Sequence, residues 1–126
     1  MGVTYVEVEL SNPARRELAP MSVTALVDPG AMTICIPQHE QTQLGLPEIE
    51  RREVRTADER SHDVPYVGPV QIRFRNRTCF TGALVIGESA LLGAVPMEDM
   101  DLVVCRSRNE VTVNPSSPNL PSAIVK

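Results

Sequence analysis

One carboxylate in this chain lies where an apolar run meets a tight turn. Residues 25–31 read Ala-Leu-Val-Asp-Pro-Gly-Ala, so Asp28 directly follows apolar residues and precedes a Pro-Gly dipeptide. Apolar residues resume within 32–36. This pattern predicts a strand that ends on Asp28 at a sheet edge, next to a turn. Such an environment can be low in dielectric constant and can tune the protonation of the acid, which suits acid–base chemistry.

The composition sets the class of protein that has to position this acid. A chain of 126 residues is expected to form one domain, and the absence of Trp with 3% aromatic residues predicts an aliphatic core. The net charge of -4 argues against a nucleic-acid surface. The sequence contains no apolar run near the roughly 20 residues that cross a bilayer, and residues 1–6 lack a signal-peptide pattern, so a cytoplasmic location is expected. Cys35, Cys79 and Cys105 are expected to be buried thiols.

The dominant hydrophobic period is two, which is typical of strands. Expected strands cover residues 5–10, 21–27, 33–36, 54–57, 64–67, 70–74, 79–86, 102–105 and 111–113, and residues 90–94 are expected to be a short buried run. Short helices are expected at 37–45, between Pro37 and Gly45, and at 96–100. The tail from residue 115 contains Pro118 and Pro121 and therefore cannot be a regular central strand. Many short strands with few helices predict an all-β, barrel-like domain.

Three segments in order resemble those of retropepsin-like aspartic proteases. Residues 25–31 are similar to the family's active-site loop, apolar-apolar-Asp-Thr-Gly-Ala, except that Pro29 replaces Thr. The run Ala90–Pro96 repeats the pattern weakly, and Leu91-Leu92-Gly93 resembles the family's second-half element that packs against that loop. The hairpin tip at 58–61 lies where the family has its substrate-covering flap. The resemblance covers about residues 3–115.

The resemblance implies a closed barrel of short antiparallel strands with one or two short helices and a flap hairpin. Residues 1–115 would form this domain, and 116–126 would be a Pro-containing tail and a candidate dimer-interface segment, together with 5–10. The implied activity is that of an aspartic endopeptidase acting as a homodimer, with one Asp from each chain and an extended peptide or protein segment as substrate. No cofactor, metal, nucleic acid or membrane is implied. The implied site residues are catalytic Asp28, the loop residues Pro29, Gly30 and Ala31, the supporting residues Leu91, Leu92 and Gly93, and the flap residues Thr56, Ala57, Asp58, Glu59 and Arg60.

Pro29 is the main departure from the family pattern. In the family, the Thr or Ser hydroxyl accepts a hydrogen bond from the equivalent backbone N–H across the dimer axis. Proline has neither group, so two reciprocal bonds worth about 1 kcal/mol each are lost. The alternative function is therefore a catalytically impaired module of the same fold that acts in binding or assembly. The alternative fold is an unrelated, monomeric β-barrel binding domain.

Simpler interpretations compete for individual residues. Asp28 can cap a backbone N–H as an Asx turn, and Gly30 can supply a positive φ. His39 begins a segment that resembles a zinc-protease helix, but Gln43 stands where the second His is needed. Ser89 is expected to be a loop residue, because its surroundings lack the closing Gly of a nucleophile elbow. Arg51, Arg52 and Arg55 alternate with Glu48, Glu50 and Glu53, which predicts a solvated, charge-compensated face.

Overall fold

Alternation of apolar and polar residues builds the first strand pair. The computed structural model describes residues 2–125. Strand β1 (Tyr5–Ser11) buries Val6, Val8 and Leu10 and exposes the residues between them. It pairs antiparallel with β2 (Met21–Val27), whose register sets Val6 opposite Ala25. Because side chains alternate across a strand, this register places the apolar face of both strands inside.

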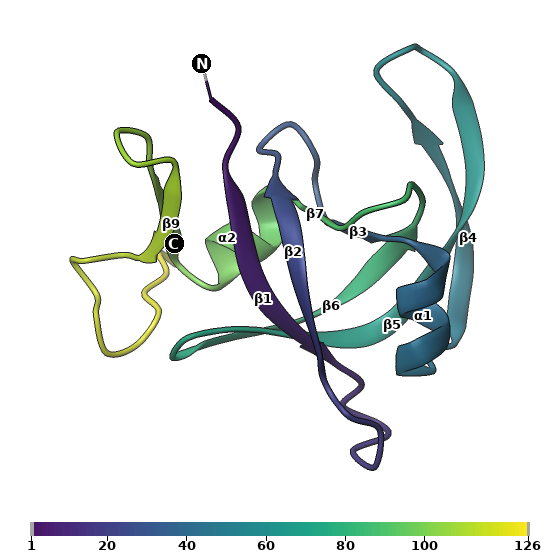
Figure 1. The fold of residues 1–126 in the computed structure, drawn as a ribbon, viewed down its shortest axis with the longest axis horizontal. Coiled ribbons are helices and arrows are strands. Elements are labelled where there is room, and N and C mark those ends of the chain that lie inside the picture. Colours follow the sequence, from purple (N-terminus) through teal and green to yellow (C-terminus); the bar gives the residue numbers. More distant parts are fainter. Residues whose placement is uncertain (1, 126) are drawn as a thin grey trace.

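The remaining elements follow in short pieces along the chain (Figure 1). They are β3 (Ile34–Ile36), α1 (Gln38–Leu44), β4 (Glu48–Arg55), β5 (Ser61–Phe74), β6 (Arg77–Val85), β7 (Leu91–Leu92), α2 (Ala94–Asp99), β8 (Leu102–Cys105) and β9 (Glu110–Val113). Helix α1 has Pro37 as its N-cap and ends at Gly45, whose φ of 62° is left-handed, as the Pro and Gly positions predicted.

Six strands close into a barrel. The order β1-β2-β7-β3-β6-β5 returns to β1 through pairs such as Leu10 with Ile72, and β4 extends the sheet beyond β5. The expected all-β closed barrel is confirmed. Its strands are not all antiparallel, however, because β2 pairs parallel with β7 and β3 pairs parallel with β6. In both cases a long connection lies between the paired strands, and such a crossover is what parallel pairing requires.

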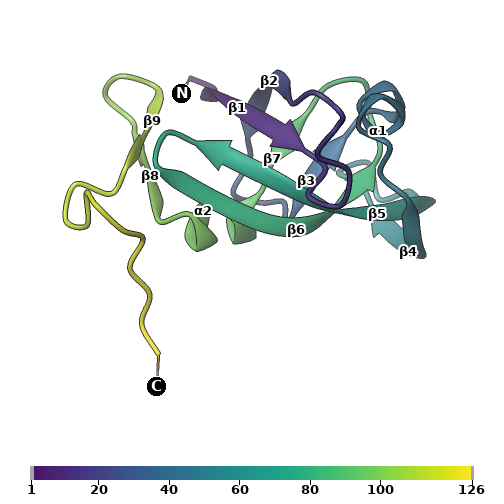
Figure 2. The same cartoon turned by 90° about the horizontal axis from the view of Figure 1, so that it is seen from below.

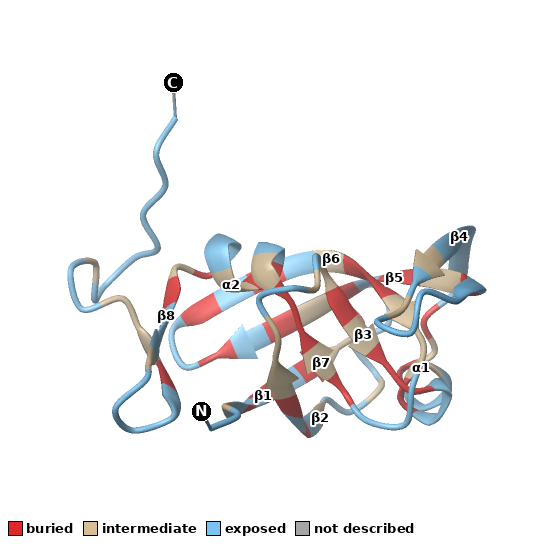
Figure 3. Cartoon of the chain, turned by 90° about the horizontal axis from the view of Figure 1, so that it is seen from above, coloured by how far each residue is buried: buried red, intermediate tan, exposed pale blue. Residues whose placement is uncertain are grey.

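The core is aliphatic, as the composition predicted. Figure 3 shows the buried positions alternating along the barrel strands with exposed ones. Leu10, Ile34, Ile36, Ile72 and Leu92 are completely buried. Cys79 is buried as expected, whereas Cys35 and Cys105 are only half-buried. Among residues 2–125, the structure contains no helix that is both long and apolar enough to cross a membrane.

The hairpin of β4 and β5, where the resemblance placed a flap, is longer than expected. β4 begins at Glu48 rather than at Val54, and β5 is one strand through residues 64–74 instead of two, with a register shift between Val67 and Val70. The sequence of β4 has no alternating hydrophobic pattern, because almost all of its side chains are exposed and most are charged. Sequence patterns therefore did not indicate the full length of this strand. Arg51 pairs with Glu48 and Asp63, and Arg52 with Glu50, which confirms the charge compensation for these two arginines.

The C-terminal part of the chain lies beside the barrel. β8 and β9 form a separate two-stranded sheet, as expected, and residues 115–125 contain no helix or strand. Figure 2 shows this tail leaving the hairpin and running away from the barrel. Its first part is held by hydrogen bonds. The Asp101 carboxylate accepts from Asn114, Ser117 and the backbone N–H of Ser122, and Arg77 donates to the carbonyl of Ser117.

Candidate active site

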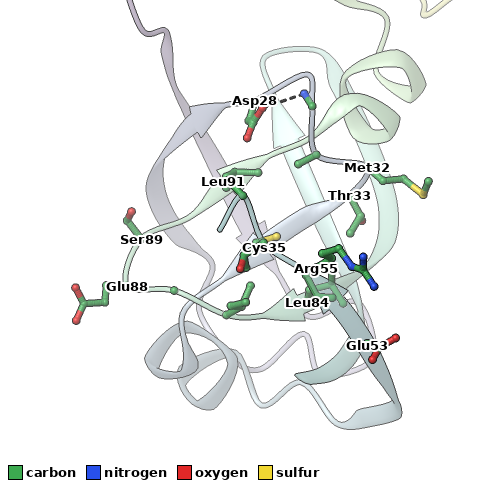
Figure 4. A pocket seen from close by; sticks show the side chains of 17 residues that line it. Asp28, Met32, Thr33, Cys35, Glu53, Arg55, Leu84, Glu88, Ser89 and Leu91 are labelled. Atoms are coloured by element: carbon green, nitrogen blue, oxygen red, sulfur yellow. Dashed lines mark hydrogen bonds between the residues drawn. The ribbon is translucent and has the colours of Figure 1, made fainter. Parts of the chain in front are cut away.

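Asp28 follows the last residue of β2 and begins a tight turn. Its backbone N–H donates to the carbonyl of Leu92 at 3.0 Å, and the N–H of Ala31 donates back to the Asp28 carbonyl at 3.1 Å. The N–H of Gly30 donates to Oδ1 of Asp28 at 2.9 Å. This bond is the Asx-turn contact expected from a simple turn residue, and it also fixes the direction of the carboxylate (Figure 4).

Gly30 is important because it has no side chain, and not because of an unusual φ. The simpler interpretation, in which Gly30 supplies a positive φ, is wrong, because the glycines of the described chain with positive φ are Gly45, Gly68 and Gly87. A Cβ on Gly30 would lie 3.2 Å from Oδ1 of Asp28, a tight approach for any side chain. Gly30 therefore lets its own amide come close to the carboxylate.

The predicted supporting segment lies against this loop. A Cβ on Gly93 would come within 2.6 Å of the Ala31 carbonyl oxygen and 2.4 Å of that of Thr33, so the backbones touch at this position. Directly after Gly93, the N–H of Ala94 donates to the Ala31 carbonyl at 2.8 Å, and the next N–H donates to Met32. In the same segment, the Leu92 carbonyl accepts the hydrogen bond from the Asp28 N–H. The structure thus brings residues 91–94 together with the loop of residues 28–32.

A cleft of about 770 Å³ lies between the Asp28 loop, the flap strand β4 and the segment before β7. Figure 4 shows Asp28 on one side of it. The lining consists of Asp28, Gly30, Ala31, Met32, Thr33, Cys35, residues 53–57, Leu84, residues 86–89 and Leu91. It is mainly aliphatic near Leu84, Ile86 and Leu91. Such a concave site, with an aliphatic wall and several polar groups, is a usual form of a ligand-binding site.

The five predicted flap residues divide between the cleft and the hairpin turn. Thr56 and Ala57 line the cleft, whereas Asp58, Glu59 and Arg60 form the exposed turn outside the lining. The Asp58 carboxylate accepts from the Thr56 hydroxyl and from the N–H of Arg60, and both bonds hold the pKa of Asp58 below its ordinary value. Glu59 has a φ of 65°, a left-handed conformation in which glycine would be unstrained.

The sequence reasoning missed several residues of the lining, of which Cys35 is the most informative. Its neighbours Ile34 and Ile36 are completely buried, so the alternation of β3 turns Cys35 to the opposite side, into the cleft. Burial, and secondly the charge of Asp28, raise the pKa of its thiol. The thiol is therefore a neutral part of the wall at neutral pH. The period of two in residues 34–36 was the signal that could have identified it.

Two other carboxylates, Glu53 and Glu88, also line the cleft. Figure 4 shows both well away from Asp28, one on the flap side and one before Ser89. Neither is placed to share a proton with Asp28. Ser89, predicted to be a loop residue, is exposed in that loop and contributes to the lining.

Pro29 points to the other side of the loop. It is exposed and lines a second hollow of about 340 Å³, together with Val27, residues 2–4, Val104, Arg106 and Asn109. Two consecutive residues therefore serve different surfaces, with Asp28 in the cleft and Pro29 in this groove.

No protein-family model matches the sequence, and no curated protein matches it. Among solved structures, the chain is similar to a retropepsin-like aspartic protease from Rickettsia conorii, with a TM-score of 0.52 and 18% sequence identity over 77% of this chain and 71% of that one. It is also similar to the simian foamy virus (mac) protease, with a TM-score of 0.46 and 17% identity over 73% of this chain and 91% of that one. With the closed barrel, the flap hairpin and the two short helices, the first similarity establishes that this chain has a retropepsin-like fold.

Proposed function

We propose that this protein is an aspartic endopeptidase that works as a homodimer. The observation that carries the proposal is the Asp28 carboxylate, which a rigid hydrogen-bonded turn holds at the side of a large cleft under a flap strand. Gly93 supports that turn from behind by direct backbone contact. Position and rigidity are what a catalytic carboxylate needs, since a misplacement of about 1 Å can cost 100-fold in rate.

The chemistry requires a second carboxylate. Two carboxyl groups about 3 Å apart share one proton, because like charges at that distance cannot both ionise. The ionised group removes a proton from a water molecule, and the protonated group donates a hydrogen bond to the peptide carbonyl that the water attacks. Because Glu53 and Glu88 lie away from Asp28, the second group in this proposal is Asp28 of another copy, related by a two-fold axis.

The free edge of β4 suits an extended substrate. β4 pairs with β5 on one side, and within residues 2–125 no strand pairs with its other side. Residues 53–57, at the end of this strand, line the cleft. A peptide backbone can hydrogen-bond to such an edge as an added strand, while its side chains enter the cleft alternately.

Peptide cleavage across acidic to neutral pH tests the proposal. We expect cleavage that falls as the pH rises, because the carboxyl pair loses its shared proton, and that disappears in Asp28→Asn. Asp63→Asn is the matched control, since Asp63 is an exposed flap residue outside the cleft. Cleavage that survives Asp28→Asn would refute the proposal, provided that circular dichroism shows both variants folded.

Pro29 favours a second candidate, an impaired module that binds a peptide without cutting it. Proline cannot make the cross-axis hydrogen bonds that the resemblance implies, so the paired carboxylates would be held less firmly. In that case the wild type would be silent and Pro29→Thr would gain activity, while binding of an extended peptide would be equal in wild type and Asp28→Asn.

A further inference from the structure

The groove next to Pro29 is built from three segments that are distant in the sequence. Residues 2–4 form one wall, Val27 and Pro29 lie at the base of the Asp28 turn, and Val104, Arg106 and Asn109 of the β8–β9 hairpin form the other wall. The first two segments are tied together, since the N–H of Val27 donates to the Thr4 carbonyl at 2.9 Å. Figure 1 shows the N-terminal segment running between the hairpin and the end of β2.

We infer that a second copy of this chain occupies this groove, and that apolar packing of the two Pro29 loops takes the place of hydrogen bonds across the axis. The inference rests on the proposed function, because it uses the requirement for two Asp28 carboxylates. It goes further by assigning the partner-binding surface and by giving Pro29 a positive role in it.

Symmetry supplies the first argument. Two Asp28 carboxylates about 3 Å apart must both lie next to the two-fold axis. The Cα of Pro29 is about 3.8 Å from that of Asp28, so Pro29 also lies near the axis, and an isologous contact brings it close to its own copy. Since Pro29 lines the groove and not the cleft, the groove is the surface that the second copy has to cover.

The chemistry of the groove agrees with an apolar contact. Pro29 has no N–H and no hydroxyl to offer, and its ring is exposed. Val3 is 62% exposed and Val104 is 36% exposed, although both are aliphatic residues on the groove wall. Arg106 is the one charged residue among the groove residues that the structure describes. Four of the eight lining residues are aliphatic (Val3, Val27, Pro29 and Val104), and Thr4 and Asn109 are polar but uncharged, so the groove favours a largely uncharged protein surface over a charged ligand.

The stiffness of proline adds a physical reason for its presence. Its ring fixes φ before association, so the loop loses less conformational freedom when it packs against a partner. A Thr or Ser at this place would gain hydrogen bonds but would have to bury its hydroxyl beside the valine side chains of the groove.

Sedimentation velocity over a concentration series tests the inference independently of catalysis. The groove variants are Val3→Glu and Val104→Glu, which place a charge in the contact, and the matched control is Phe80→Glu, an equally exposed apolar residue (59%) on β6 outside the groove. We expect a wild-type dimer, a dissociation constant raised about 100-fold by each groove variant, and no change in the control.

The outcomes separate the two proposals. A wild-type dimer that both groove variants leave unchanged would overturn the inference and leave the homodimeric peptidase intact. A chain that stays monomeric at every concentration would overturn both. Cleavage by a strictly monomeric chain would refute the inference and also the two-chain site.

A second measurement needs no substitution. Hydrogen exchange of the wild type above and below its dissociation constant should show that the amides of residues 2–4 and 104–109 become protected together with dimer formation. Protection confined to other parts of the chain would place the interface elsewhere and overturn the inference.

Discussion

At the residue scale, Gly93 is the position near the proposed site that has the least room for a side chain. A Cβ there would meet two backbone oxygens, and backbone cannot move aside as a flexible side chain can. We expect Gly93→Ala to destabilise the fold by about 1–3 kcal/mol, as overpacking usually does, and to displace the Asp28 loop. Urea unfolding and the peptide-cleavage assay measure the two effects.

Gly87→Ala provides the contrast for Gly93→Ala. Gly87 has a φ of 85°, but a Cβ there would have ample room, so the substitution brings conformational strain without a clash. It should cost about 1 kcal/mol and leave the Asp28 loop in place. Equal effects of the two variants would show that backbone contact at Gly93 does not hold the loop.

Glu40 gives a pH-dependent prediction at the same scale. This residue of α1 is 6% exposed, its Oε1 has no partner among the described residues, and burial raises the pKa of its carboxyl, against a smaller opposing effect of His39. Because the folded-state pKa lies above the unfolded one, the protonated carboxyl stabilises the fold at low pH, and this contribution is lost as the pH rises through the folded pKa.

Glu40→Gln should therefore stabilise the protein at neutral pH by about 1 kcal/mol, since it removes a buried charge that lacks a full set of partners. Below the ordinary pKa of a glutamate the two proteins should be equally stable. Thermal unfolding at pH 4 and pH 7 checks this, and a variant that is less stable at neutral pH would contradict the sign.

At the element scale, sequence patterns predicted most strands but not which strands pair with each other in the sheet. Period-two alternation located β1 and β2, and Pro37 and Gly45 bracketed α1, because these signals act within a few residues. Strand β4 was missed in part because its faces are polar. The parallel pairing of β3 with β6 depends on packing between distant segments, and no local pattern records it.

The same distinction holds for the candidate site. Asp28, Gly93 and Thr56 were predicted through the order of three motifs, and the structure brings all three segments together around the cleft or its supporting turn. Arg77 lies outside the expected strands 70–74 and 79–86, yet it belongs to β6 and is completely buried, and it donates to the tail carbonyl of Ser117. Arg77 contacts the C-terminal tail, which lies about 40 residues further along the chain. Patterns within a few residues cannot predict such a contact.

The flap turn gives an element-scale prediction. The Asp58 carboxylate closes this turn by accepting from the Thr56 hydroxyl and the Arg60 N–H, and its lowered pKa means that these bonds persist above the ordinary pKa and weaken as the pH falls through the folded value. Asp58→Ala should speed hydrogen exchange at residues 56–60 and raise KM, with global stability almost unchanged because the turn is exposed. Unchanged exchange would show that the backbone alone orders the turn.

The tail anchor gives the second prediction at this scale. Hydrogen bonds from Ser117, then Asn114, then the N–H of Ser122 lower the pKa of Asp101 to about 2. Since the folded pKa lies below the unfolded one, the anchor stabilises the fold above about pH 4 and is lost only as the pH falls through about 2. The tail should therefore stay attached over the acidic range in which an aspartic peptidase works.

Asp101→Asn removes this anchor's charge. Limited proteolysis should then cut within residues 114–122 much faster than in the wild type, while the barrel stays intact. Asp99→Asn is the matched control, because Asp99 is a neighbouring exposed acid that makes no hydrogen bond to the tail among the described residues. Equal cutting of the wild type and Asp101→Asn would show that the tail is held by Arg77 and by Asn76, whose side-chain amide donates to the Pro118 carbonyl.

At the scale of the whole molecule, the Asp28 turn separates two surfaces with different tasks. The cleft on one side is the proposed peptide site, and the groove on the other side is the proposed interface between copies. Placing both on one short turn couples them, because any shift of Pro29 on association moves the neighbouring carboxylate. In the proposed enzyme, pairing of the chains and assembly of the catalytic pair are thus a single event.

Mixing of chains tests that coupling. If each active site takes one Asp28 from each of two chains, a pair of one wild-type and one Asp28→Asn chain is inactive. At equal amounts, random pairing leaves about half of the wild-type chains in wild-type pairs, so activity per wild-type chain should fall to about half, and further with excess variant. The double variant Asp28→Asn with Val104→Glu should inhibit only at about 100-fold higher concentration, because its pairing is weakened by that factor. Inhibition by the double variant at the concentration at which Asp28→Asn inhibits would show either that Val104 takes no part in pairing or that competition for substrate lowers the rate, and sedimentation of the double variant distinguishes the two.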